Sequence, residues 1–459
     1  MDFLLRREWT DGGLNKSFLL GAVLSGPFVE AVIPVPGISF LFAFIYLVYS
    51  FLTGGLQQQL VFLRLKKSFL FVLLILIHCF AFFFTSGAFP NGYWIFYFTF
   101  LYSVYLWSPN RVEGDTVLKG VAFVLVPLAL LFSGVAFLKL VLIERGMLLA
   151  PFYFVYKNAV WGQPWGSSLR SDYNVFSMGL LVAAYFILSG YWLKNRIINW
   201  CSLLLLVIVV FYSGSRRGFL YLFSIPIVFI ISEVIKGKMR LSVCLKQCVY
   251  FASLGVLVYL STSIILTDIR HDHYRIWPDF TGVGRVQLAH VYTVVPMRLE
   301  SSHADNVQDF TSSSERPFTS SSERPFTSSE RINRWSYAID LLAEQGFLAP
   351  GGYEYQAKFG CRFYKCSEPD YPHNLILSEW LVGGIFGLLV LFGCVVFFLA
   401  QMKFLLGFSF GVDLACVAFL VMPSLLISGD YLFCSSMAVI VLLLAKMLYE
   451  SYQKIEDIF

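Results

Sequence analysis

The stretch NLILSEWLVGGIFGLLVLFGCVVFF, residues 374–398, decides the fold class of this chain. It is almost wholly apolar, and a helix needs about 20 such residues to cross the hydrocarbon core of a bilayer. Comparable apolar runs occupy residues 18–34, 36–55, 68–88, 91–108, 117–137, 174–193, 199–213, 217–235, 247–266, 406–428 and 431–449. The sequence therefore predicts an all-α polytopic membrane protein with about twelve transmembrane helices.

The composition supports a membrane environment and argues against a water-soluble globule. Hydrophobic residues make up 58% of the 459 residues and charged residues only 14%, whereas soluble domains carry about 25% charged residues. The net charge of +5 comes from short basic clusters between apolar runs, not from a basic stripe with interleaved aromatic residues. We therefore expect membrane lipid, and no nucleic acid, as a partner.

The basic clusters also predict the orientation, because cytoplasmic loops of membrane proteins are enriched in Lys and Arg. With twelve spans and both termini in the cytoplasm, every cluster falls on the cytoplasmic side of a bacterial inner membrane. The clusters are Arg6, Arg7 and Lys16; Arg64, Lys66 and Lys67; Lys194 and Arg196; Lys236, Lys238, Arg240 and Lys246; Lys403; Lys446 and Lys454. Residues 1–266 then hold spans one to nine, residues 267–373 form a large periplasmic loop, and residues 374–459 hold spans ten to twelve.

The periplasmic loop contains an octapeptide repeat at residues 310–331. FTSSSERP at 310–317 recurs at 318–325, and a third copy, FTSSER, is one Ser shorter. Because the first two copies are polar and rich in Ser, they are predicted to form a spacer without a core of its own.

The third copy leads into a predicted short amphipathic helix at the membrane surface. Thr327 to Glu330 has the capping-box pattern of a helix start. Trp335, Ile339 and Leu342 follow at helical spacing, and Gly346 offers a stop. Further along the loop, Cys361 and Cys366 lie five residues apart in an oxidising compartment, so we expect a disulfide between them.

Three groups of residues at the predicted outer face are candidates for chemistry. Arg216 and Arg217 begin a helix where its dipole disfavours cations, which suggests that they hold an anion; interfacial arginines extending to the lipid surface are an equal alternative. Arg331 and Trp335 suit a diphosphate and a sugar ring, although a surface helix with a buried Trp explains them as well. Pro372 suits the first turn of a helix, so His373 is expected at the outer mouth of span ten. The positive end of a helix disfavours a cation and so keeps an imidazole neutral there. An interfacial His without a role is the alternative.

These residues together resemble the O-antigen ligase and polymerase superfamily, over residues 165–400. The resemblance is carried by His373-Asn374 followed by Gly384-Ile-Phe-Gly387, by Ser215-Arg216, by Arg331 four residues before Trp335, and by Arg170-Ser-Asp-Tyr-Asn174. The chain departs from the family pattern at Gly351-Gly352-Tyr353, where the family has Gly-x-Gly. Arg316 and Arg324 of the repeats mimic the family arginine, but only Arg331 adjoins the Trp-bearing helix.

The resemblance implies a GT-C-like fold and a metal-independent inverting glycosyltransferase without a cofactor. Its donor would be an undecaprenyl-diphosphate-linked oligosaccharide, and a chain-length regulator protein would be a partner. The roles that follow are catalytic for His373, Arg331 and Arg216, and substrate-binding for Arg217, Arg170, Asn374, Trp335 and Tyr371. We expect Arg216, Arg331 and His373 to converge on one lipid diphosphate pocket.

The sequence favours a polymerase, which moves the growing glycan onto a lipid-linked repeat unit. An O-antigen ligase, which transfers glycan to lipid A core, is the close alternative. A lipid-linked oligosaccharide flippase is the alternative of another class, but it has no use for a loop of this size. Two other groups of histidines are weaker candidates. His271 and His273 could bind a metal, but a third ligand at suitable spacing is not evident. His78 lies in the middle of a span and is expected to be a packed polar residue.

Overall fold

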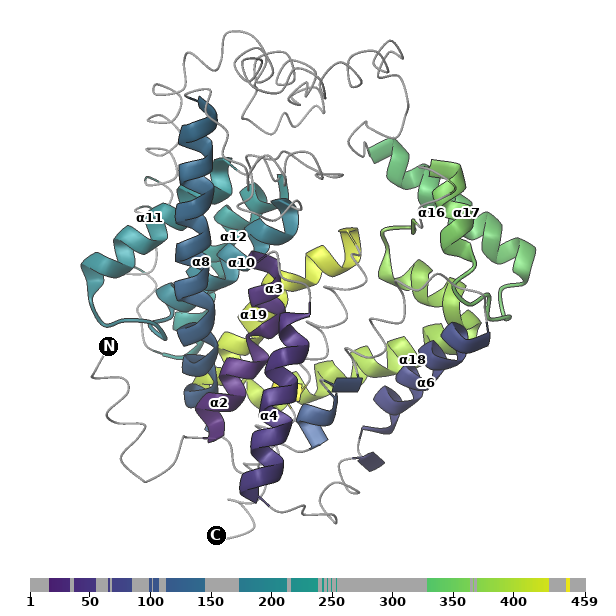
Figure 1. The fold of residues 1–459 in the computed structure, drawn as a ribbon, viewed down its shortest axis with the longest axis horizontal. Helices are drawn as coiled ribbons and strands as arrows, with labels where there is room; N and C mark the ends of the chain where they lie inside the picture. The colour runs from purple at the N-terminus through teal and green to yellow at the C-terminus, as the bar shows by residue number, and fades with distance from the viewer. Residues whose placement is uncertain are drawn as a thin grey trace, which may run out of the picture. The chain divides into compact units, whose positions relative to one another are not determined.

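The computed structural model is all-helical in the part of the chain that it describes (Figure 1). That part comprises residues 16–33, 37–54, 65–66, 68–84, 99–100, 102–106, 113–144, 173–212, 216–237, 328–363, 366, 370–428 and 443–445, with single residues at 242, 246, 249 and 253. The helices are α2 (Lys16–Leu24), α3 (Gly26–Val32), α4 (Ile38–Gly54), α6 (Phe69–Phe84), α8 (Gly114–Glu144), α10 (Tyr173–Leu188), α11 (Arg196–Tyr212), α12 (Arg216–Ile235), α16 (Ser328–Gln345), α17 (Tyr355–Phe363), α18 (Leu375–Leu405) and α19 (Ser409–Ser428).

Most of the predicted spans coincide with one of these helices. Two helical segments, Gly114–Leu138 and Leu375–Leu405, are by themselves long and apolar enough to cross a bilayer. The predicted span at 18–34 is interrupted, because α2 ends at Leu24 and α3 begins at Gly26; Pro27, which has no N–H to donate, lies at this break. Most of the runs at 91–108, 247–266 and 431–449 lies outside the described residues, so the count of twelve stays a prediction.

The exposed surfaces of the helices are those of a membrane protein. Phe51 of α4, Phe83 of α6 and Phe392 of α18 are 68%, 75% and 65% exposed. In water, many large exposed apolar side chains would favour association, whereas lipid accepts them. His78 of α6 and Ser378 and Glu379 of α18 are instead buried, whereas Lys403, near the end of α18, is exposed.

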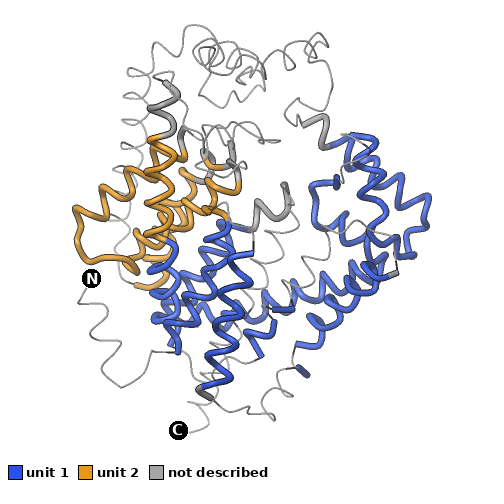
Figure 2. Tube along the Cα trace, in the orientation of Figure 1, with its two compact units in different colours: residues 1–30, 35–125, 328–459 blue, residues 31–34, 126–327 orange. Residues whose placement is uncertain are grey.

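The chain divides into two compact units, shown in Figure 2. Unit 1 comprises residues 1–30, 35–125 and 328–459, and unit 2 comprises residues 31–34 and 126–327. In unit 2, α10 packs against both α11 and α12, and its side chains from Val175 to Ile187 are buried. In unit 1, α6 and α18 run side by side (Figure 1), and α16 and α19 also pack against α18.

Helix α18 is broken one third of the way along, at Gly384. This residue has φ 61° and ψ −158°, a conformation that glycine adopts readily and other residues rarely. The loop that follows α16 uses the break, because the N–H groups of Gly351 and Gly352 donate to the carbonyls of Leu381 and Val382, each at 3.0 Å. Two glycine motifs that are far apart in the sequence thus form the two sides of one contact.

The loop helices α16 and α17 pack on this part of α18 and on α6. Ala338, Leu341 and Leu342 of α16 lie in one core with Phe359 of α17 and Leu381 of α18. Helix α16 begins at Ser328 and ends at Gln345, and Gly346 follows with φ 84°, so its predicted start and stop are confirmed.

The predicted apolar face of α16 is only partly correct. Leu342 is buried, but Ile339 is half exposed and Trp335 only partly buried. The buried face includes Arg334, and a reading based on hydropathy misses a face that contains a charged residue.

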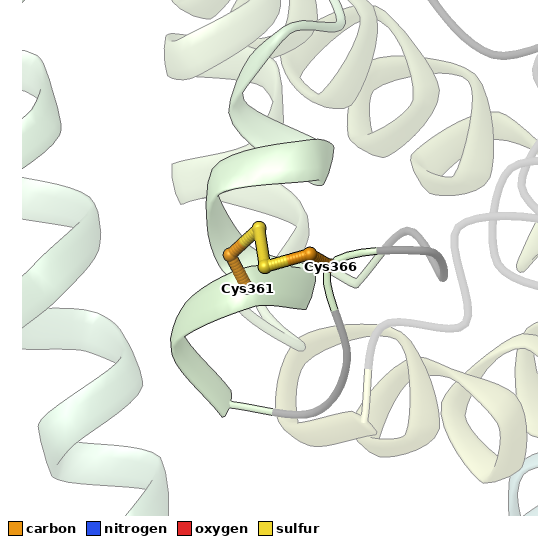
Figure 3. Close-up of a disulfide and its surroundings, with 2 residues drawn as sticks. All are labelled: Cys361 and Cys366. Carbon is orange, nitrogen blue, oxygen red and sulfur yellow. A yellow bond between two sulfur atoms is a disulfide. The ribbon is translucent and has the colours of Figure 1, made fainter.

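The predicted disulfide joins Cys361, in the last turn of α17, to Cys366 (Figure 3). It closes a short loop in the segment between α17 and α18. The octapeptide copies before α16, at residues 310–325, lie outside the described residues.

Candidate functional site

His373 lies immediately before the start of α18. Asn374 is the N-cap of this helix, and its side chain accepts a hydrogen bond from the N–H of Leu377 at 3.2 Å. The expectation that Pro372 lies in the first helical turn is therefore wrong, because Pro372 is two residues before the cap. His373 itself has φ 55°, and it is the sole residue other than glycine with positive φ in the described part of the chain. Such a conformation costs on the order of 1 kcal/mol and often marks a functional position.

The imidazole of His373 is partly buried between an aromatic ring and a carboxylate. The ring of Tyr371 lies 4.2 Å from the imidazole, centroid to centroid, at an interplanar angle of 42°. The Nε2 atom of His373 is 3.6 Å from Oδ1 of Asp370, and the His373 side chain remains 17% exposed. The site thus offers a histidine that is held in place and still reachable from outside.

Arg334 of α16 anchors the segment that carries these residues. Its Nη1 atom forms a buried ion pair with Oδ2 of Asp370, and the same nitrogen donates to the carbonyl of Tyr371 at 3.3 Å. The guanidinium carbon also lies 4.7 Å from the ring centroid of Phe363. Both charged side chains are nearly inaccessible, with Arg334 3% and Asp370 5% exposed.

The charges around Asp370 set its protonation state. Burial by itself would raise the pKa of this carboxyl, but His373 and Arg334 outweigh burial, and the pKa lies below its usual value. Asp370 is therefore an anion at neutral pH. Sequence reasoning missed both Asp370 and Arg334, although Asp370 is three residues before His373 and Arg334 is one turn after Arg331, spacings that could have marked them.

A second polar cluster lies beneath the loop, between α6 and α18. His78 of α6 contacts Tyr353 through Nδ1 at 2.7 Å and Glu379 through Nε2 at 3.0 Å. All three residues are buried. Both hydrogen bonds of His78 can form at once if the Tyr353 hydroxyl donates to Nδ1 and Nε2–H donates to the carboxylate of Glu379. His78 is thus a packed polar residue, as predicted, and its partner Glu379 is a feature that the sequence reading did not single out.

The other predicted site residues fall at helix starts or outside the described residues. Arg216 and Arg217 are the first two residues of α12, in unit 2. Arg331 lies in the first turn of α16, one turn before Arg334, and so belongs to the same unit as His373. Trp335 lies next to Arg334 on the same helix, with its indole nitrogen buried. Arg170 lies outside the described residues.

Comparison with known proteins supplies the family. Residues 201–392 match the family model described as O-antigen ligase. The match is narrower than the resemblance over 165–400 and leaves out Arg170. It includes Arg216, Arg331, His373 and Gly384, the residue at which α18 is broken. No curated protein and no solved structure matches the chain. Residues 201–392 of this membrane protein are therefore similar to the O-antigen ligase family, in agreement with the resemblance to the O-antigen ligase and polymerase superfamily, whose members are glycosyltransferase-like enzymes that act on lipid-linked glycans.

Proposed function

We propose that the protein is a surface-polysaccharide polymerase of the bacterial inner membrane. It transfers the growing glycan from undecaprenyl diphosphate to a lipid-linked repeat unit at the periplasmic face. The observation that carries this proposal is the placement of His373: an accessible imidazole beside a buried carboxylate, at the start of α18 and within the family-matched segment. The histidine is the general base that such a transfer needs.

The reaction assigns one task to each of the candidate residues. An acceptor hydroxyl attacks the anomeric carbon, the bond from that carbon to the diphosphate oxygen breaks, and inversion results. His373 takes the hydroxyl proton, and the lipid diphosphate leaves with the bonding electrons. Arg331 and Arg216 stabilise the negative charge that develops on the diphosphate, because guanidinium groups bind phosphate oxygens in a bidentate manner.

The remaining candidates serve substrate binding. Arg217 and Arg170 add positive charge for the diphosphate, and Trp335 and Tyr371 offer ring surfaces for sugars. Asn374 caps α18 and so fixes the position of its neighbour His373. A chain-length regulator protein is proposed as a partner in the membrane.

The disulfide supports an outer location for the loop. Disulfides persist in the periplasm and are rare in the cytoplasm, and Cys361 is bonded to Cys366 in the segment assigned to the periplasm. The disulfide thus supports the proposal that the His373 segment lies on the side where activated sugars arrive on lipid carriers and not as nucleotide sugars.

An O-antigen ligase is the second candidate, because the family model carries that description. The two activities share the donor and the base and differ in the acceptor, which is a lipid-linked repeat unit for the polymerase and lipid A core for the ligase. A flippase, which moves the lipid-linked glycan without chemistry, would not need His373 as a base.

A deletion strain distinguishes these functions. We expect loss of long-chain polymer with single repeat units still attached to lipid A core, seen on lipopolysaccharide gels. Long polymer that stays on the lipid carrier would indicate the ligase, and repeat units trapped in the cytoplasm would indicate the flippase. Complementation with His373→Ala should fail at normal protein level in the membrane, while His271→Ala, a matched change in the same loop, should restore polymer. Normal polymer from His373→Ala would refute the proposed chemistry.

A further inference from the structure

The protonation and orientation of His373 depend on residues outside the set that the sequence identified. We infer that Asp370, held in place by Arg334, is the positioning residue of His373: its carboxylate accepts the Nε2 proton, so that Nδ1 is the nitrogen that accepts the substrate proton. This inference rests on the proposed function and assigns the roles of the two imidazole nitrogens in it.

The first support is the way in which both oxygens of Asp370 are occupied. Oδ2 is paired with the guanidinium of Arg334. Oδ1 accepts the backbone N–H of Tyr371 at 2.8 Å and faces Nε2 of His373 at 3.6 Å. The backbone N–H of Asp370 in turn donates to the carbonyl of Gln356 at 3.0 Å. The carboxylate is therefore fixed relative to the imidazole, with few other orientations open to it.

The second support is the difference between the two imidazole nitrogens. The Nε2 atom is buried and lies on the Asp370 side of the ring, where a sugar hydroxyl has no access. A separation of 3.6 Å is longer than a hydrogen bond, but contacts of this kind commonly shorten when the substrate binds. With the proton on Nε2 facing the carboxylate, the lone pair of the neutral imidazole resides on Nδ1.

The charges near His373 favour this arrangement at neutral pH. Among the described residues, the groups that interact with the ring or its carboxylate include Asp370, Arg334, Tyr371 and, from α17, Tyr355. Burial raises the pKa of Tyr355 to about 12, so its hydroxyl stays neutral. Arg334 is permanently charged, and Asp370 is an anion. The imidazole of His373 therefore lies beside a fixed negative charge.

The proton balance follows from this geometry. When the acceptor oxygen bonds to the anomeric carbon, its proton moves to Nδ1 and the imidazole becomes an imidazolium. The negative charge of Asp370 stabilises that cation, as an orienting carboxylate does in the Ser-His-Asp triad. After the lipid diphosphate leaves, the proton passes to water and the neutral base is restored.

Asp370→Asn tests the inference, because it keeps the shape of the side chain and removes its charge. An amide that donates to Nε2 would favour the wrong tautomer, so we expect the rate to fall on the order of 10²-fold or more. The imidazolium also loses its stabilising charge and forms only at lower pH. The acidic limb of the pH–activity profile should therefore move to lower pH, by about one unit or more.

The assay uses the purified full-length chain in detergent with lipid-linked repeat units extracted from the deletion strain. Asp370→Glu should restore part of the rate and return the acidic limb toward its original pH, as a charge effect requires. An unchanged pH profile in Asp370→Asn, with only a uniform loss of rate, would overturn the inference.

A second readout covers the case in which Asp370→Asn fails to fold. Arg334→Lys keeps a cation beside Asp370 but loses the planar fork, so it should be folded and retain the pH profile at reduced rate. Arg334→Lys keeps the Asp370 carboxylate. If the acidic limb of its pH–activity profile nevertheless moved to lower pH as far as expected for Asp370→Asn, the inference would be overturned. If His373→Ala is fully active, the proposed function itself fails; if His373→Ala is inactive but the carboxylate variants keep the original profile, only the inference fails.

Discussion

At the scale of single residues, the arginines of α16 separate into two roles. Arg334 is buried and tied to Asp370, and its role is to hold the His373 segment. Arg331 lies one turn earlier, at the start of the helix, and is the one proposed to bind the diphosphate. The two residues are three positions apart, about one turn of the helix.

We predict that Arg331→Lys fails nearly as badly as Arg331→Ala. A lysine supplies a point charge but not the bidentate fork that matches a diphosphate, so polymer synthesis should fall at least about tenfold, the equivalent of about 1.4 kcal/mol. The measurement is polymer length and amount on gels, normalised to protein in the membrane. Arg324→Ala, in the predicted spacer, is the control and should be nearly silent. Full activity of Arg331→Lys would show that only general positive charge is needed.

At the scale of elements, α6 and α18 are joined by a buried polar contact within their apolar interface. His78 and Glu379 meet at 3.0 Å, both nearly inaccessible. Removal of one partner takes away this contact in a low-dielectric environment, where the loss of a buried hydrogen bond costs about 1–3 kcal/mol. The contact therefore links the first third of α18, which follows His373, to α6.

We predict that His78→Ala lowers the thermal unfolding temperature of the detergent-solubilised protein by several degrees, because the buried Glu379 loses its hydrogen bond to the imidazole. The double variant His78→Ala with Glu379→Gln should be less destabilised than the sum of the two single variants, since both single changes affect the same contact. Strict additivity in this cycle would show that the two side chains do not stabilise each other.

The break in α18 gives a second prediction at this scale. A Cβ atom at Gly384 would lie 2.5 Å from the carbonyl oxygen of Leu348 and 2.8 Å from the carbonyl of Ala349, and the backbone φ is positive. Gly384→Ala should therefore destabilise the protein by more than the roughly 1–2 kcal/mol of the conformational penalty alone and should displace the loop from α18. Gly134→Ala, where nothing lies within 4 Å of the added atom, is the matched control and should be neutral or slightly stabilising. Thermal unfolding of both variants decides; equal unfolding temperatures would mean that the loop adjusts freely.

At the scale of the whole molecule, the predicted topology has both termini in the cytoplasm and residues 267–373 in the periplasm. Reporter fusions after Lys238 and after Asn306 should accordingly report opposite sides of the membrane, with alkaline phosphatase active only at the second position. Activity of the same reporter at both positions would mean that the twelve-span topology is wrong. A fusion after Lys403 serves as the control, because it should match the result at Lys238.

The repeat segment gives the last prediction at this scale. Deletion of residues 310–325 removes two octapeptide copies and keeps the third copy, α16 and the whole of the His373 segment. Because the deleted residues are polar and without apolar periodicity, polymer should still be made at near-normal length. Deletion of residues 326–345, which removes α16, should abolish it. Loss of polymer from the first deletion at normal protein level would show that the spacer has a function.

The sequence by itself determined the helical membrane class, the family resemblance, the bounds of α16, the Cys361–Cys366 pair and the place of His373 before α18. These features depend on local apolar length, capping residues and short motifs, which act within a few turns of chain. Only the tertiary structure decided that Arg334 pairs with Asp370, that His78 meets Glu379, and that Gly351 and Gly352 dock at the break beside Gly384. The physical reason is that a buried charge is stable only with a partner, and that partner can come from any element that folding brings near. Along the chain, Arg334 and Asp370 are 36 residues apart and His78 and Glu379 are 301 apart, separations over which no local pattern operates.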